Sequence, residues 1–157
     1  MANDLRITDL VAGRMLDGMF GAAFDLIKSG IIRIYADAGT PDIPAGQPAL
    51  GASHGTLLAE LVFHATTPFV AAAASTTFMQ IVAGGAGEEI TADASANNAG
   101  DAVYFVAYDD DATDVALVQG TVGTSGCDMT IDNVTIAAGA NVSCSNFTIK
   151  MPKGWTT

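Results

Sequence analysis

Apolar residues recur at helical spacing near the start of the chain. From about Thr8 to Ser29 they fall three or four positions apart, as Leu10, Val11, Met15, Met19, Ala22, Ala23, Leu26 and Ile27. This spacing places them on one face of an α-helix, with Thr8 as a cap and Gly30 as a stop. The glycines inside the pattern each cost about 1 kcal/mol relative to alanine, so packing must hold the helix in place. The pattern predicts an N-terminal helical arm over residues 1–30, packed against either a neighbouring subunit or its own chain.

The apolar period changes from helical to alternating at Ile31, and short runs typical of strands follow. The predicted strands are residues 31–36, 56–63, 77–83, 102–108, 115–122, 128–131, 134–136 and 142–151. In residues 102–108, Val103, Phe105 and Ala107 fall on one side and Tyr104, Val106 and Tyr108 on the other. Short strands separated by turn residues are typical of sandwiches. We therefore predict a mainly β protein: a jelly-roll-like antiparallel β-sandwich over residues 31–157 with one N-terminal α-helix.

A long proline-containing segment interrupts the strand pattern between residues 37 and 55. It contains Pro41, Pro44 and Pro48, together with several glycines and alanines. Loops of this length in a compact domain are usually functional or flexible, and prolines favour an extended path. The segment is therefore a candidate contact loop.

The charge content is low and its sign is acidic. Only 15% of the residues are charged against 50% hydrophobic, which favours a surface covered by other subunits in a homo-oligomer, a dimer or trimer. A net charge of −11 argues against direct contact with nucleic acid, which requires cations. No uncharged apolar run reaches the roughly 18 residues of a membrane span, so no membrane association is expected.

Acidic residues near the N-terminus do not fit a secretory signal, so we expect synthesis in a bacterial cytoplasm. Reduced thiols are then the expected state of Cys127 and Cys144. A disulfide between them is the alternative, since the two cysteines fall near consecutive strands.

No constellation of catalytic residues stands out, and we predict a protein that is not an enzyme and has no cofactor. His54 and His64 match no zinc-ligand spacing, and no nucleophile-elbow motif is present. The carboxylates between Asp109 and Asp114 are the best cation candidate, because hard cations prefer oxygen ligands. They lack an EF-hand pattern, and an acidic turn is the favoured interpretation, so no metal is predicted.

Five segments in order resemble small virion structural proteins of tailed bacteriophages that are similar to capsid decoration, or cement, proteins. They are residues 32–35, 55–63, 120–126, 136–143 and 147–149. The resemblance spans roughly residues 5–152 and rests on strand and turn patterns. It implies a jelly-roll-like sandwich on the capsid surface of a virion, with the major capsid protein as partner.

The resemblance implies that the protein stabilises the phage head by bridging major capsid protein subunits. Adaptable apolar side chains and an extended loop are suited to such contacts. The candidate interface residues are Met15, Met19, Phe20, Pro41, Pro44, Pro48 and Trp155. Two alternatives stay open at this point: a tail- or fibre-associated virion protein, and a carbohydrate-binding β-sandwich module.

Overall fold

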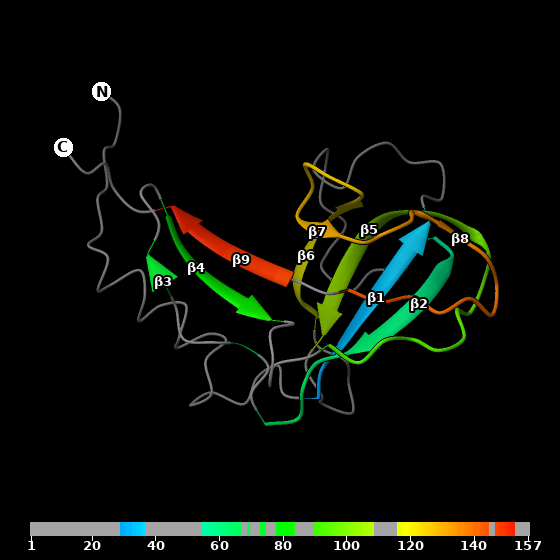
Figure 1. Ribbon diagram of the computed structural model, residues 1–157, viewed down its shortest axis with the longest axis horizontal. Helices are drawn as coiled ribbons and strands as arrows, with labels where there is room; N and C mark the ends of the chain where they lie inside the picture. The colour runs from blue at the N-terminus through cyan, green and yellow to red at the C-terminus, as the bar shows by residue number, and fades with distance from the viewer. Residues whose placement is uncertain are drawn as a thin grey trace.

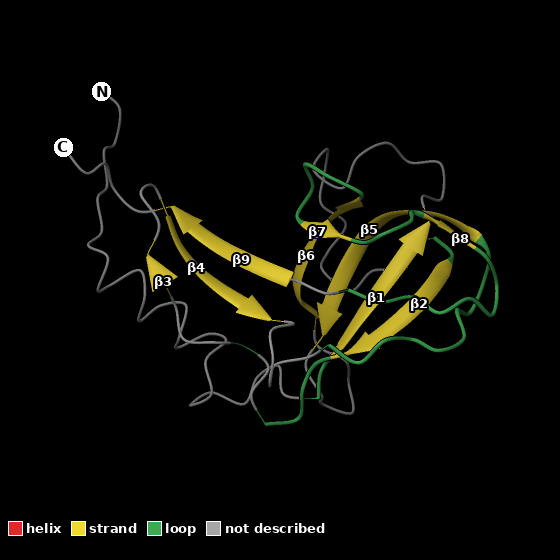
Figure 2. Cartoon of the chain, in the orientation of Figure 1, coloured by secondary structure: helices red, strands yellow, loops and turns green. Residues whose placement is uncertain are grey.

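The computed structural model of the chain describes residues 29–36, 55–66, 69, 73–74, 78–83, 90–108, 116–144 and 147–152 (Figure 1). This part is mainly β, and its strands are joined by loops with no helix among the described residues (Figure 2). The predicted N-terminal helix and most of the predicted contact loop, residues 37–55, lie outside the described residues.

Nine strands make up the described part of the chain. They are β1 (Ile31–Ala36), β2 (Leu57–Val62), β3 (Ala73–Ala74), β4 (Phe78–Ala83), β5 (Gly100–Tyr108), β6 (Ala116–Gly123), β7 (Met129–Thr130), β8 (Thr135–Ile136) and β9 (Phe147–Pro152). They hydrogen-bond in the order β2-β1-β5-β6-β7-β9-β4-β3, and β8 pairs with the start of β5. The paired strands β4 and β9 extend to one side of the β2-β1-β5-β6 group (Figure 1).

The sheet is mixed, which corrects the prediction of a purely antiparallel arrangement. Val122 and Gly123 of β6 pair in parallel with Met129 and Thr130 of β7, whereas the other strand pairs are antiparallel. A run of bends over residues 124–128 returns the chain far enough for β7 to run in the direction of β6. Turn residues in the sequence therefore predicted the break between the strands but not the direction of the second strand.

Two other strand predictions differ from the structure. The predicted strand over residues 142–151 begins only at Phe147, because Val142 makes a single isolated bridge to Asp93. The alanine-rich connector includes the two-residue strand β3, whose Ala73 and Ala74 pair with β4. In both cases the pairing partner, and not the local pattern, decides which residues are strand.

The apolar core lies on one face of the β1-β5 pair. Ile32, Ile34 and Phe105 alternate with residues of the opposite face and are at most 1% exposed. Four phenylalanines pack together around this face, with ring centroids between 5.2 and 6.2 Å apart: Phe63, Phe69, Phe105 and Phe147. Burial of each such side chain stabilises the fold by about 1.5–3 kcal/mol relative to exposure. Since Phe147 belongs to β9 and Phe105 to β5, this cluster joins the two ends of the strand order.

Candidate functional site

The interface residues predicted from the sequence are not tested by the structure. Met15, Met19, Phe20, Pro41, Pro44, Pro48 and Trp155 all lie outside the described residues, as does the acidic segment between Asp109 and Asp114. The interface and the cation candidate therefore stay predictions.

His64 takes part in a local turn. Its Nδ1 accepts a hydrogen bond from the backbone N–H of Thr66 at 3.3 Å and lies 3.2 Å from the Thr66 hydroxyl. His54 lies outside the described residues. Within the part of the chain that the structure describes, no three His, Cys, Asp or Glu side chains form a group that suits a metal ion.

The two cysteines are free thiols, as expected, and the alternative of a disulfide between them is wrong. The half-buried Cys127 donates from Sγ to the backbone oxygen of Met129 at 2.8 Å. The buried Cys144 contacts the backbone oxygen of Thr130 at 3.9 Å. Both thiols therefore flank β7, one on each side of the shortest link in the sheet.

The larger of two cavities lies beside β7, between β6 and β9, and has a volume of about 460 Å³. It is lined by Phe105, Val118, Gln119, Cys127, Asp128, Thr130, Phe147, Thr148 and Ile149. Apolar side chains from β5, β6 and β9 form its inner surface, and Asp128 is the one charged residue among these lining residues. We call this cavity the β6–β9 groove.

Asp128 closes one end of the β6–β9 groove. Its Oδ2 accepts hydrogen bonds from the backbone N–H and the hydroxyl of Thr121, both at 2.9 Å, and Thr121 Oγ1 accepts the Asp128 N–H at 3.3 Å. Gly120 lies directly below, and a Cβ there would be only 2.9 Å from both Asp128 and the Phe105 ring. The carboxylate can reach Thr121 only because residue 120 has no side chain.

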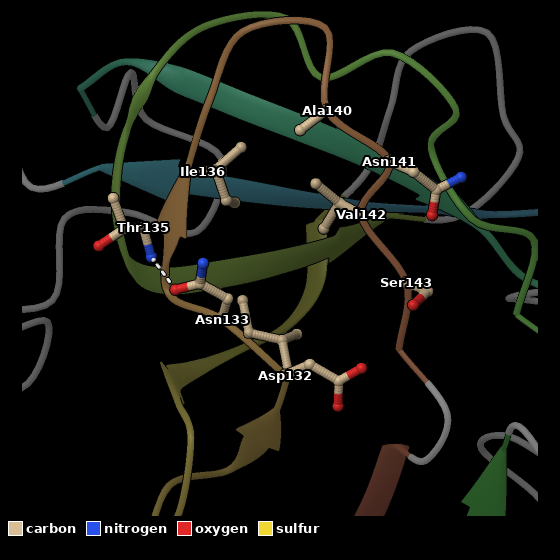
Figure 3. Close-up of a pocket in the computed structure, with 9 residues that line it drawn as sticks. Asp132, Asn133, Thr135, Ile136, Ala140, Asn141, Val142 and Ser143 are labelled. Carbon is tan, nitrogen blue, oxygen red and sulfur yellow. Dashed lines mark hydrogen bonds between the residues drawn. The ribbon is translucent and has the colours of Figure 1, made fainter.

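A smaller cleft of about 150 Å³ lies among residues 131–143 (Figure 3). Its floor contains Ile136 and Val142, which are buried, while Asp132, Asn133 and Asn141 are exposed at its rim. The Asn133 carbonyl accepts a hydrogen bond from the backbone N–H of Thr135 at 3.0 Å, so it serves a local turn. In Figure 3 the Asp132 and Asn141 side chains point away from each other, and the cleft does not gather its polar groups around one point.

Three tyrosines pack together on the face of the β1-β5 pair opposite the core. Tyr35 stacks on Tyr104 with ring centroids 5.2 Å apart, and its hydroxyl lies 3.4 Å from that of Tyr108. The Arg33 guanidinium lies 4.9 Å above the Tyr108 ring and pairs with Glu60 at 3.4 Å. Burial, followed by the hydrogen bond to Tyr108, raises the pKa of the Tyr35 hydroxyl well above its usual value.

The tyrosine cluster was visible in the sequence, whereas the groove was not. Alternation alone placed Tyr104, Val106 and Tyr108 on one side of a strand, and the structure confirms this, since they form one buried cluster. The β6–β9 groove depends on how two strands distant in sequence separate beyond β7, and no local pattern records that separation.

None of the helices that the described residues could form meets the length and apolar content needed to cross a membrane, because the described part contains strands and loops. Comparison with known proteins finds no matching family model, no matching curated protein and no matching solved structure.

Proposed function

We propose that this chain is a virion structural protein of a tailed bacteriophage, a decoration protein that stabilises the head by bridging major capsid protein subunits. In this proposal it acts on the capsid surface as a homo-oligomer, a dimer or trimer, and performs no catalysis. Its β-strands form a jelly-roll-like sandwich, and the N-terminal helix is an arm that contacts a neighbour.

One observation carries the proposal: the segments that resemble virion proteins coincide with elements that build the core. Residues 32–35 lie in β1, residues 55–63 include β2, and residues 147–149 begin β9. Their side chains include the buried Ile32, Phe63 and Phe147. The resemblance thus falls on residues that determine the fold and not on isolated surface positions.

The described residues also suit a load-bearing role. The residues that are buried among them are all apolar or tyrosine, with no buried charged group in this part of the chain. Such a core needs no bound group to complete it, and low charge on the remaining surface favours subunit contacts.

The carbohydrate-binding alternative gains no support from the tyrosines. A sugar platform needs exposed aromatic faces, whereas Tyr104 and Tyr108 are 6% and 5% exposed. A tail- or fibre-associated protein is distinguished from a decoration protein by its copy number, because only the decoration protein follows the capsid lattice.

The test compares phage particles with and without this protein. Under heat or low salt, particles that lack it should burst earlier, and adding back the purified protein should restore their resistance. Mass spectrometry of purified particles should find it in hundreds of copies or another multiple set by the lattice. Equal survival together with immunolabelling of the tail would refute the decoration role in favour of the tail role.

A further inference from the structure

The strand position between β6 and β9 is occupied by the chain only at β7. Met129 pairs with Val122 on β6 and with Phe147 on β9, and Asp128 occupies the next place beside Thr121. Before Asp128 the chain bends away over residues 124–127 and leaves the line of the strand. The β6–β9 groove, with its volume of about 460 Å³, begins where the chain departs.

We propose that the β6–β9 groove binds an extended segment of a partner protein, which continues the line of β7 as an added strand. This inference goes beyond the proposed function, because it assigns a docking site and the chemistry of its occupant whatever the partner is. Addition of a strand to a sheet edge supplies main-chain hydrogen bonds, and pockets for alternate side chains supply specificity.

The register of β7 determines how the added strand would lie. Because β7 is parallel to β6 and antiparallel to β9, the added strand runs in the same directions. Continued register places its residues beside Leu117–Gly120 of β6 and Ile149–Pro152 of β9. The segment is therefore about four residues long, and its C-terminal end meets Asp128 and Cys127.

The lining of the groove specifies the side chains of the segment. Val118 of β6 and Ile149 of β9 pack against the core cluster, so alternate residues of the segment face an apolar surface. The one charged lining residue among those described is Asp128, and the whole chain carries a net charge of −11. Charge complementarity thus favours a partner segment with Lys or Arg at its outward positions over a second copy of this acidic chain.

Cys127 makes the orientation of a bound segment measurable, because its half-buried thiol lines the groove beside Asp128. The probe is a six-residue peptide of alternating valine and lysine with a cysteine at one end, held as a mixed disulfide with thionitrobenzoate. The Cys127 thiolate attacks the sulfur of the peptide cysteine, a protein–peptide disulfide forms, and thionitrobenzoate leaves as a coloured thiolate. The thiol proton passes to the buffer, so no further oxidant is needed.

We expect the peptide with a C-terminal cysteine to label Cys127 roughly tenfold faster than the same peptide with an N-terminal cysteine, since binding raises the local disulfide concentration. A glutamate-for-lysine peptide should react at the slower rate. The exposed Thr130 lines the groove, so Thr130→Trp should fill it and abolish the difference. Val103→Trp, at a partly exposed position of β5 that does not line the groove, should leave the difference unchanged.

Equal labelling rates from the two peptide ends in the wild-type protein would overturn the proposal. Concentration-dependent self-association that Thr130→Trp abolishes would also overturn it, because the occupant would then be a second copy. Neither result bears on the burst test of the phage particles, so failure of the groove and failure of the capsid role are distinguishable.

Discussion

Two glycines are required at their positions for different physical reasons. At Gly120 the obstacle is space, because a Cβ would lie 2.9 Å from the Phe105 ring and from Asp128. At Gly139 the space is open, but φ is +78°, a value that side chains with a Cβ rarely adopt. Gly139 is the third residue of a turn closed by the hydrogen bond from the Ala140 N–H to the Ala137 oxygen, and a type II turn requires that φ there.

Substitution with alanine and asparagine separates the two causes. Gly120→Ala should lower the free energy of unfolding by about 1–3 kcal/mol through overpacking. Gly139→Ala should lower it by about 1–2 kcal/mol through backbone strain. Asparagine tolerates positive φ, so Gly139→Asn should recover part of the loss, whereas Gly120→Asn should be worse than Gly120→Ala. Urea denaturation measures all four variants, and recovery by asparagine at position 120 would contradict the steric explanation.

Tyr35 makes the stability of the fold sensitive to alkaline pH. Burial and the hydrogen bond to Tyr108 raise the pKa of Tyr35 in the folded state, whereas in the unfolded chain it stays near the usual value of about 10. Above that pH the folded state binds more protons than the unfolded state, so the free energy of unfolding falls as pH rises. Below the unfolded pKa the contribution is fully present.

We expect the free energy of unfolding to decline between about pH 10 and the higher folded-state pKa of Tyr35, and Tyr35→Phe to flatten that decline. The variant also loses the hydroxyl contact with Tyr108, so it should be somewhat less stable at neutral pH. Urea denaturation at a series of pH values separates the offset from the slope. An unchanged slope in Tyr35→Phe would exclude this tyrosine as the titrating group.

At the scale of elements, the outer edge of β2 is covered by an irregular segment and not by a strand. Val62 exchanges both backbone hydrogen bonds with Thr91, and the Leu58 oxygen accepts from Asn97 N–H at 2.7 Å. The Glu60 N–H donates to the Asp93 carboxylate at 3.0 Å. Edge strands with open hydrogen-bonding groups invite pairing with other chains, so this segment protects β2 from aggregation.

Removal of the Asp93 carboxylate should uncover the middle of this edge. Asp93→Ala leaves the Glu60 N–H and the Ser95 N–H without their carboxylate acceptors, which should cost about 1–3 kcal/mol. The Glu60 amide should then exchange with solvent faster in hydrogen-exchange measurements, and light scattering should increase on storage.

The matched control for this change is Asp101→Ala. Its carboxylate accepts the Thr135 hydroxyl at 2.7 Å in an exposed contact away from β2. It should destabilise the protein by about 1 kcal/mol or less and leave exchange at Glu60 unchanged. Faster exchange at Glu60 in both variants would indicate general destabilisation and not an uncovered edge.

For the whole molecule, the predicted division is between an arm, residues 1–30, and a β domain, residues 31–157. The described core consists of residues from position 32 onward, and β1 begins at Ile31, where the sequence pattern changes from helical to alternating. The arm itself lies outside the described residues, so its role is a matter for experiment.

Deletion of residues 1–30 should leave a folded β domain that no longer associates. Circular dichroism should retain a β spectrum, while sedimentation should change from a dimer or trimer to a monomer, because apolar contacts of the arm are lost. Full association of the truncated protein would show that the arm serves only its own subunit. Loss of the β spectrum would show that the arm completes the core.

Much of the strand content was determined by the sequence alone. The predicted strand 31–36 agrees with β1, and the predicted pair over residues 102–108 and 115–122 is the antiparallel β5–β6 pair. These predictions hold because side chains of a strand alternate between two faces, so a half-buried strand carries its own period. Free thiols and the joint burial of Tyr104, Val106 and Tyr108 followed from equally local arguments.

Only the tertiary structure decided how the strands meet. Val142 and Phe147 both belong to one apolar, alternating run, yet only Phe147 begins a strand, because Val142 meets a single bridge partner in Asp93. The parallel direction of β7 and the groove beside it depend on residues 124–128, whose bends return the chain beside β6. Alternation specifies which face of a strand is buried, but it does not specify its neighbour, because pairing uses backbone groups that every residue shares.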